Sequence, residues 1–103
     1  TSYFRGAMGI PLSAGTPDSF YALGLLEAKS GNHRVAVENY NKALTINQNY
    51  APAFLARGIS YYRMGNESQA EKDAQMAALL FEEQQNPQGL QASDDFLQGM
   101  VAM

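Results

Sequence analysis

Few side chains in this sequence could do chemistry, and those few stand apart from one another. His33 is the only histidine, and neither a cysteine nor a carboxylate pair accompanies it at a metal-binding spacing. We therefore expect His33 to be a surface residue in a turn. The paired acids Glu82–Glu83 and Asp94–Asp95 are typical of a solvated helix face and of a helix start. The remaining candidates are hydroxyls without a neighbouring base, namely Ser60, Ser68 and Thr45. The sequence therefore predicts no enzyme, no metal and no cofactor.

The amino-acid composition is typical of one globular domain. Of the 103 residues, 46% are apolar and 17% are charged, with a net charge of −3 and no cysteine. No run of Lys or Arg could track phosphates, so we expect no nucleic-acid partner. No stretch approaches the roughly 20 consecutive apolar residues of a membrane helix, so we expect no direct membrane insertion. Because the sequence begins at Thr1 and not at Met, we expect a fragment or a trimmed chain.

A spacing of 34 residues organises the chain. Seven residue types return at this offset: Phe20, Ala22, Gly24, Gly31, Asn32, Ala36 and Ala43 recur as Phe54, Ala56, Gly58, Gly65, Asn66, Ala70 and Ala77. A fixed period of this length is typical of stacked helical hairpins that contact only their neighbours. The sequence therefore predicts an all-α solenoid, which favours a binding surface over a catalytic pocket.

Local signals place the helices. Thr16-Pro17-Asp18 supplies an N-cap, a proline at the first helical position and an acid in the first turn. A helix should run from there to about residue 30, where Gly31 stops it. Further helices are expected over about 34–47, 51–64 and 67–85, and a last helix capped by Ser93 over 93–103, after a loop over 87–92. The domain, 17–103, would thus hold two repeats, 17–50 and 51–84, and a capping helix.

The repeated small residues have a packing role in this arrangement. Gly24 and Gly58 lack a side chain, so the second helix of each hairpin can approach the first closely. Ala36 and Ala70 are expected to meet these glycines where the helices cross.

These residues and their spacing resemble the tetratricopeptide repeat. The matching residues are Phe20, Leu23, Gly24, Ala36, Tyr40 and Ala43 in the first copy, and Phe54, Gly58, Tyr61, Ala70 and Ala77 in the second. The departures, where the family usually has leucine, an aromatic residue or proline, are Glu27, Gln48, Arg57, Ala74 and Glu82. Two repeats are fewer than the three usually needed for stability, so terminal segments or a second protomer must supply further burial.

The resemblance implies a concave surface formed by the first helix of each hairpin. Helical periodicity then predicts its exposed residues as Tyr21, Leu25, Ala28, Lys29, Leu55, Ile59, Tyr62 and Arg63. Family members that grip the acidic tails of chaperones use a Lys, Asn and Arg clamp, but its places fall here on Tyr21, Leu25 and Ala56, which argues against one. We expect this groove to bind an apolar peptide or an amphipathic helix, with Lys29 and Arg63 meeting acids on the ligand.

The expected function is therefore a protein–protein interaction scaffold for assembly, targeting or regulation. One alternative is a structural role, in which the groove is the interface of a homodimer. Another is that residues 1–16 fill the groove, since this irregular, glycine-rich segment carries the apolar residues Tyr3, Phe4, Met8, Ile10 and Leu12. The stretch Gly6-Ala7-Met8-Gly9 within it is either native sequence or partly derived from a vector.

Overall fold

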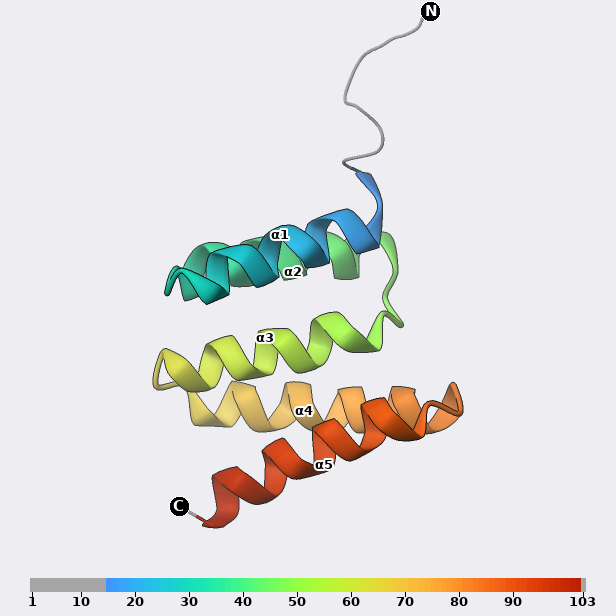
Figure 1. The fold of residues 1–103 in the computed structure, drawn as a ribbon. Coiled ribbons are helices and arrows are strands. Elements are labelled where there is room, and N and C mark those ends of the chain that lie inside the picture. Colours follow the sequence, from blue (N-terminus) through green and yellow to red (C-terminus); the bar gives the residue numbers. More distant parts are fainter. Residues whose placement is uncertain (1–14, 103) are drawn as a thin grey trace, which may run out of the picture.

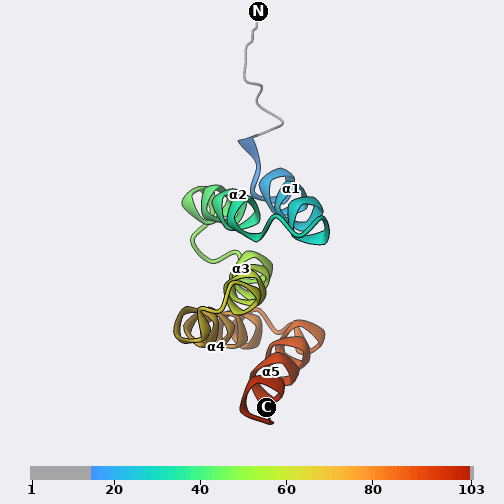
Figure 2. The same ribbon diagram turned by 90° about the vertical axis from the view of Figure 1, so that its left-hand side faces the viewer.

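The computed structural model describes residues 15–102, in which five helices follow one another and no strand occurs (Figure 1). The helices are α1 (Pro17–Lys29), α2 (His33–Ile46), α3 (Ala51–Arg63), α4 (Glu67–Glu83) and α5 (Pro87–Ala102). Seen along the helices, α2 and α4 lie on one side of the stack and α1 and α5 on the other (Figure 2). The all-α solenoid of two antiparallel hairpins is therefore present. The predicted N-terminal segment lies almost wholly outside the described residues.

Local sequence signals account for the ends of the paired helices. The Thr16 hydroxyl accepts a hydrogen bond from the Ser19 N–H at 3.0 Å, which caps α1 at the expected residue. Gly31 and Gly65 have φ of +86° and +87°, a left-handed backbone that glycine adopts without steric cost. The 34-residue repeat of Gly-Asn is therefore a repeat of one tight turn between paired helices.

The last helix begins six residues earlier than the sequence analysis predicts, so the expected loop over 87–92 is wrong. Pro87 is the first residue of α5, a position where its missing N–H costs nothing. The Asn86 side chain caps the helix by accepting from the Gly89 N–H at 3.0 Å. Ser93, the predicted cap, is fully buried inside α5, where its hydroxyl donates to the Gly89 carbonyl at 3.0 Å.

The core consists mainly of alanines, with a few large side chains between them. One cluster, between α2 and α3, surrounds the fully buried ring of Tyr40. A second cluster, between α3, α4 and α5, centres on Leu80 and Phe81. Phe54 packs against both clusters and so joins the two repeats. Small side chains let the helices approach closely, as the repeated alanines predict.

The two repeated glycines lie at helix crossings, but they meet different partners. A Cβ at residue 58 would come within 3.0 Å of the Ala70 carbonyl oxygen, so Gly58 lies where it was expected. A Cβ at residue 24 would overlap the ring of Tyr40, which is the nearest group to it. Ala74 is the counterpart of Tyr40 in the second repeat. The first hairpin is therefore spaced by an aromatic ring, and the second by direct backbone contact.

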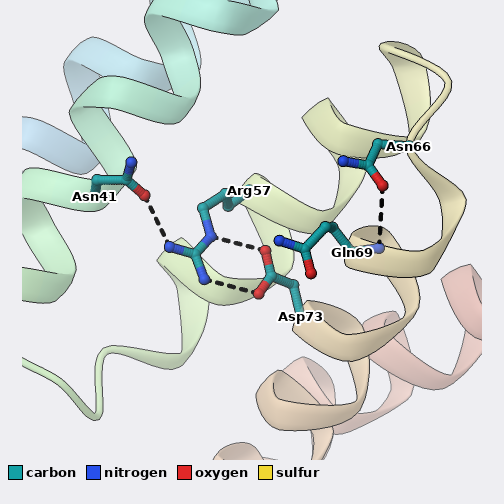
Figure 3. Close-up of polar contacts among 5 residues, drawn as sticks. All are labelled: Asn41, Arg57, Asn66, Gln69 and Asp73. Carbon is teal, nitrogen blue, oxygen red and sulfur yellow. Dashed lines mark hydrogen bonds and ion pairs between the residues drawn. The ribbon is translucent and has the colours of Figure 1, made fainter.

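Arg57 connects three helices across the boundary between the repeats (Figure 3). Its Nε and Nη2 donate to the two carboxylate oxygens of Asp73 on α4, at 2.7 and 2.8 Å. Its Nη1 donates to Oδ1 of Asn41 on α2, at 2.8 Å. The hydrogen bond to Asp73 raises the pKa of Arg57 above its ordinary value. The family's usual leucine is therefore replaced here by an ion pair, and the first repeat has Leu23 and Asn39 at the two equivalent places.

Candidate peptide-binding groove

The surface between α1 and α3 contains two adjoining hollows, each of about 400 Å³. The hollow near the C-terminal ends of these helices, here called the basic hollow, is lined chiefly by Leu25, Lys29, His33, Ile59, Ser60 and Arg63. The other, the aromatic hollow, is lined chiefly by Tyr21, Leu25, Pro52, Leu55, Ile59 and Phe81. Leu25, Ala56 and Ile59 belong to both, so the two hollows form one continuous groove.

Seven of the eight residues predicted for the groove surface line these hollows: Tyr21, Leu25, Ala28, Lys29, Leu55, Ile59 and Arg63. Their arrangement follows from the repeat, because α1 and α3 present equivalent faces to the same side of the stack. Leu25 is 43% exposed and Ile59 is 37% exposed, so the middle of the groove is open and apolar. That these residues bind a ligand remains a prediction.

Tyr62 lies elsewhere. Its ring is half-buried and packs edge-on against Phe96 of α5, with 5.8 Å between the ring centroids. It lines neither of the two hollows. Because α5 starts at Pro87, the helix passes over this face of α3 and covers the residue that periodicity assigned to the groove.

Three polar residues that were not predicted for the groove also line the basic hollow, namely His33, Tyr40 and Ser60. His33 was expected in an exposed turn, but it is the half-buried first residue of α2, and its Nδ1 lies 3.4 Å from the Ser60 Oγ. Ser60 is 1% exposed. Tyr40 is fully buried, and its hydroxyl has no hydrogen-bond partner of normal geometry among residues 15–102. Burial, and to a smaller extent Tyr21, raise the pKa of Tyr40 to about 12, while the nearby Ser60 hydroxyl opposes that rise.

The aromatic hollow has a fixed wall. The ring of Tyr21 packs against Tyr40 and Tyr50, with centroid distances of 6.2 and 5.7 Å. The Tyr50 hydroxyl donates to the carboxylate of Asp18 at the start of α1. Burial and this bond to Asp18 raise the pKa of Tyr50. A ligand would therefore meet a wall that is already ordered, which reduces the entropic cost of binding.

The described part of the chain lacks the features of two other kinds of site. No three residues of the types His, Cys, Asp or Glu within 15–102 gather closely enough to hold a metal ion. Of the helices in the same range, none has the length and apolar character needed to cross a membrane.

Comparison with known proteins agrees with the repeat. Residues 24–65, from the middle of α1 to the end of α3, match the family model of the TPR repeat. This match agrees with the resemblance that the 34-residue period carries, and TPR repeats generally mediate protein–protein interactions. The family is a scaffold fold for protein interaction and not an enzyme fold.

One solved structure with a similar fold is the crystal structure of MamA, with a TM-score of 0.61 and 15% sequence identity. The match covers 87% of this chain and 63% of that chain, so this chain spans less than two thirds of its length. At this identity the similarity concerns the fold alone. No curated protein matches the sequence.

Proposed function

We propose that this chain is a scaffold that holds an apolar peptide or an amphipathic helix of a partner protein in the groove between α1 and α3. The observation that carries this proposal is the pair Leu25 and Ile59, one from each helix. They form an apolar floor that continues into both hollows, and both stay open to solvent. Burying such side chains against a partner removes apolar surface from water, which favours association.

The experiment is affinity capture from a native lysate with two matched variants. Leu25→Glu with Ile59→Glu places two charges on the groove floor. Leu26→Glu with Met76→Glu places two charges on side chains that are 63% and 41% exposed and line neither hollow. We expect a protein that the unmodified chain and the outer variant capture and the groove variant loses. Retention by the groove variant, with helical content unchanged in both, would contradict the proposal.

Self-association is the second candidate function. It is favoured by apolar side chains that remain exposed outside the groove, among them Leu26 at 63%, Leu79 at 51% and Val101 at 84%. Molecular mass measured by light scattering over a range of concentrations separates the two functions. A monomer that gains order on adding a peptide supports the scaffold, and a concentration-dependent dimer supports self-association.

Filling of the groove by the chain's own N-terminal segment is tested by removing residues 1–15. If that segment covers the groove, the shortened chain exposes apolar surface and binds more of a fluorescent apolar dye. Unchanged dye binding and unchanged stability would exclude this alternative.

A further inference from the structure

We propose that the groove takes an acidic amphipathic helix in one direction, with the N-terminal acid of the ligand on Lys29 and Arg63 and its apolar residues toward Tyr21 and Leu55. This inference rests on the proposed function and adds to it the charge, the spacing and the polarity of the ligand.

The first observation is the distribution of charge. All ten Asp and Glu side chains belong to the described residues, yet none of them lines either hollow. Lys29 and Arg63 both line the basic hollow, and neither belongs to the two ion pairs of the described chain, Arg34–Glu38 and Arg57–Asp73. A chain with a net charge of −3 thus has a groove whose only formal charges are positive. Complementarity favours an acidic ligand at this end.

The second observation is that polar side chains line the basic hollow and apolar side chains line the aromatic hollow. The basic hollow places the imidazole of His33 and the hydroxyl of Ser60 beside the two cations, above the unpartnered hydroxyl of Tyr40. An apolar side chain here would keep water away from these groups and leave the Tyr40 hydroxyl without a partner, which is costly. A carboxylate accepts several hydrogen bonds at once and suits such donors. The aromatic hollow offers Tyr21, Leu55 and Phe81 and suits apolar side chains.

The third observation is the distance between the two ends of the groove. Tyr21 and Lys29 are eight positions apart on α1, and so are Leu55 and Arg63 on α3. At about 1.5 Å of rise per residue, eight positions span about 12 Å. A ligand helix lying along the groove therefore needs its acid and its far apolar anchor about two helical turns apart.

The direction follows from the helix dipoles. α1 and α3 run the same way, so both C-terminal ends lie at the basic hollow (Figure 1). The partial negative charge of these two helix ends is smaller than the two full positive charges of Lys29 and Arg63, so a ligand helix needs an acid at the end that lies there. An acid is most favourable in the first turn of a helix, beside that helix's own positive N-terminus. The ligand should therefore run antiparallel to α1 and α3, with its acid preceding its apolar anchors.

The chain's own N-terminal residues do not have the charge expected of this ligand. Residues 1–14 contain one basic residue, Arg5, and no acid. That segment therefore has nothing to pair with Lys29 and Arg63, and the inference commits to an acidic partner instead.

The probes are three labelled, alanine-based helical peptides of 16 residues, whose binding is followed by fluorescence anisotropy. The first has Glu at position 4 and Leu and Phe at positions 8 and 11, the second has Lys in place of Glu, and the third has the order reversed. We expect the first peptide to bind the unmodified chain about tenfold more tightly than either of the others. Equal binding of the first two, or no binding by any peptide, would overturn the inference.

Charge reversal on the protein completes the test. Lys29→Glu with Arg63→Glu should weaken the Glu peptide about tenfold and make the Lys peptide the preferred one. Arg34→Glu with Lys72→Glu changes net charge equally outside the groove and should leave the preference unchanged. Leu25→Glu with Ile59→Glu reports on the groove itself. If Leu25→Glu with Ile59→Glu abolishes binding while charge reversal changes nothing, the groove is the binding site but its ligand is not selected for acidic residues. If Leu25→Glu with Ile59→Glu binds both peptides as the unmodified chain does, the proposal that the groove binds peptides is wrong as well.

Discussion

Replacing Arg57 by leucine, the residue usual in the family, should destabilise this chain. The Asp73 side chain is 9% exposed, and Arg57 supplies its carboxylate with two charge-assisted hydrogen bonds at 2.7 and 2.8 Å. Removing one partner of a buried pair typically costs about 3–5 kcal/mol, because the other charge is left buried and unpaired. The Arg57 side chain is 21% exposed, so solvent reaches the site and the lower figure of about 3 kcal/mol applies. For a chain of this size that lowers the melting temperature by roughly 12 °C or more.

A double-mutant cycle isolates the pair from the surrounding contacts. Arg57→Leu, Asp73→Ala and the double variant are each unfolded in urea and followed by circular dichroism. We expect the double variant to be less destabilised than the two single changes added together, with a coupling energy of about 2 kcal/mol. Arg57→Lys should fall between the unmodified chain and Arg57→Leu, because an ammonium cannot make the bidentate contact. A coupling energy near zero, or a cost below about 1 kcal/mol for Arg57→Leu, would show that the ion pair does not stabilise the fold.

Two further predictions concern helix packing and pH. Gly89→Ala should destabilise the fold by about 1–3 kcal/mol, because a Cβ at this position overlaps the ring of Phe81. Gly99→Ala has open space around its Cβ and should be neutral or stabilising by up to about 1 kcal/mol. Urea unfolding measures both changes, and equal effects of the two variants would contradict the prediction. Stability should fall as pH rises from 10.0 to about 12, since the phenol of Tyr40 ionises at its ordinary pKa of 10.0 when unfolded and at about 12 when folded. Tyr40→Phe should make this fall less steep in urea unfolding at successive pH values, and an identical slope would count against the raised pKa.

The 34-residue period was sufficient to predict the fold, because it fixes which helices pair and which faces they share. The sequence does not predict the start of α5, because Asn86-Pro87 indicates the end of α4 as well as the start of the next helix. The same arrangement at Thr16-Pro17 was correctly interpreted as a helix start. The turn between α4 and α5 has no glycine to mark it, because Gln85 adopts φ of +58° where the two earlier turns have Gly31 and Gly65. Nothing in its residue type marks that backbone conformation.

Groove residues that lie on one face of α1 or α3 could be predicted from the sequence. Those whose position depends on contacts between several helices could not. Periodicity along α1 and α3 identifies Leu25 and Ile59, but it does not show that α5 passes over Tyr62. His33 and Tyr40 reach the basic hollow from α2, through the crossing geometry of the first hairpin. That geometry depends on the ring of Tyr40 lying over Gly24, a contact that no spacing rule contains.

The most direct test of the groove is to follow the methyl resonances of leucine and isoleucine by nuclear magnetic resonance while the acidic helical peptide is added. We expect shifts for Leu25, Leu55 and Ile59, which line the groove, and none for Leu26 and Leu79, which are exposed outside it. Shifts confined to Leu26 and Leu79, with the groove methyls unchanged at saturating peptide, would contradict this expectation.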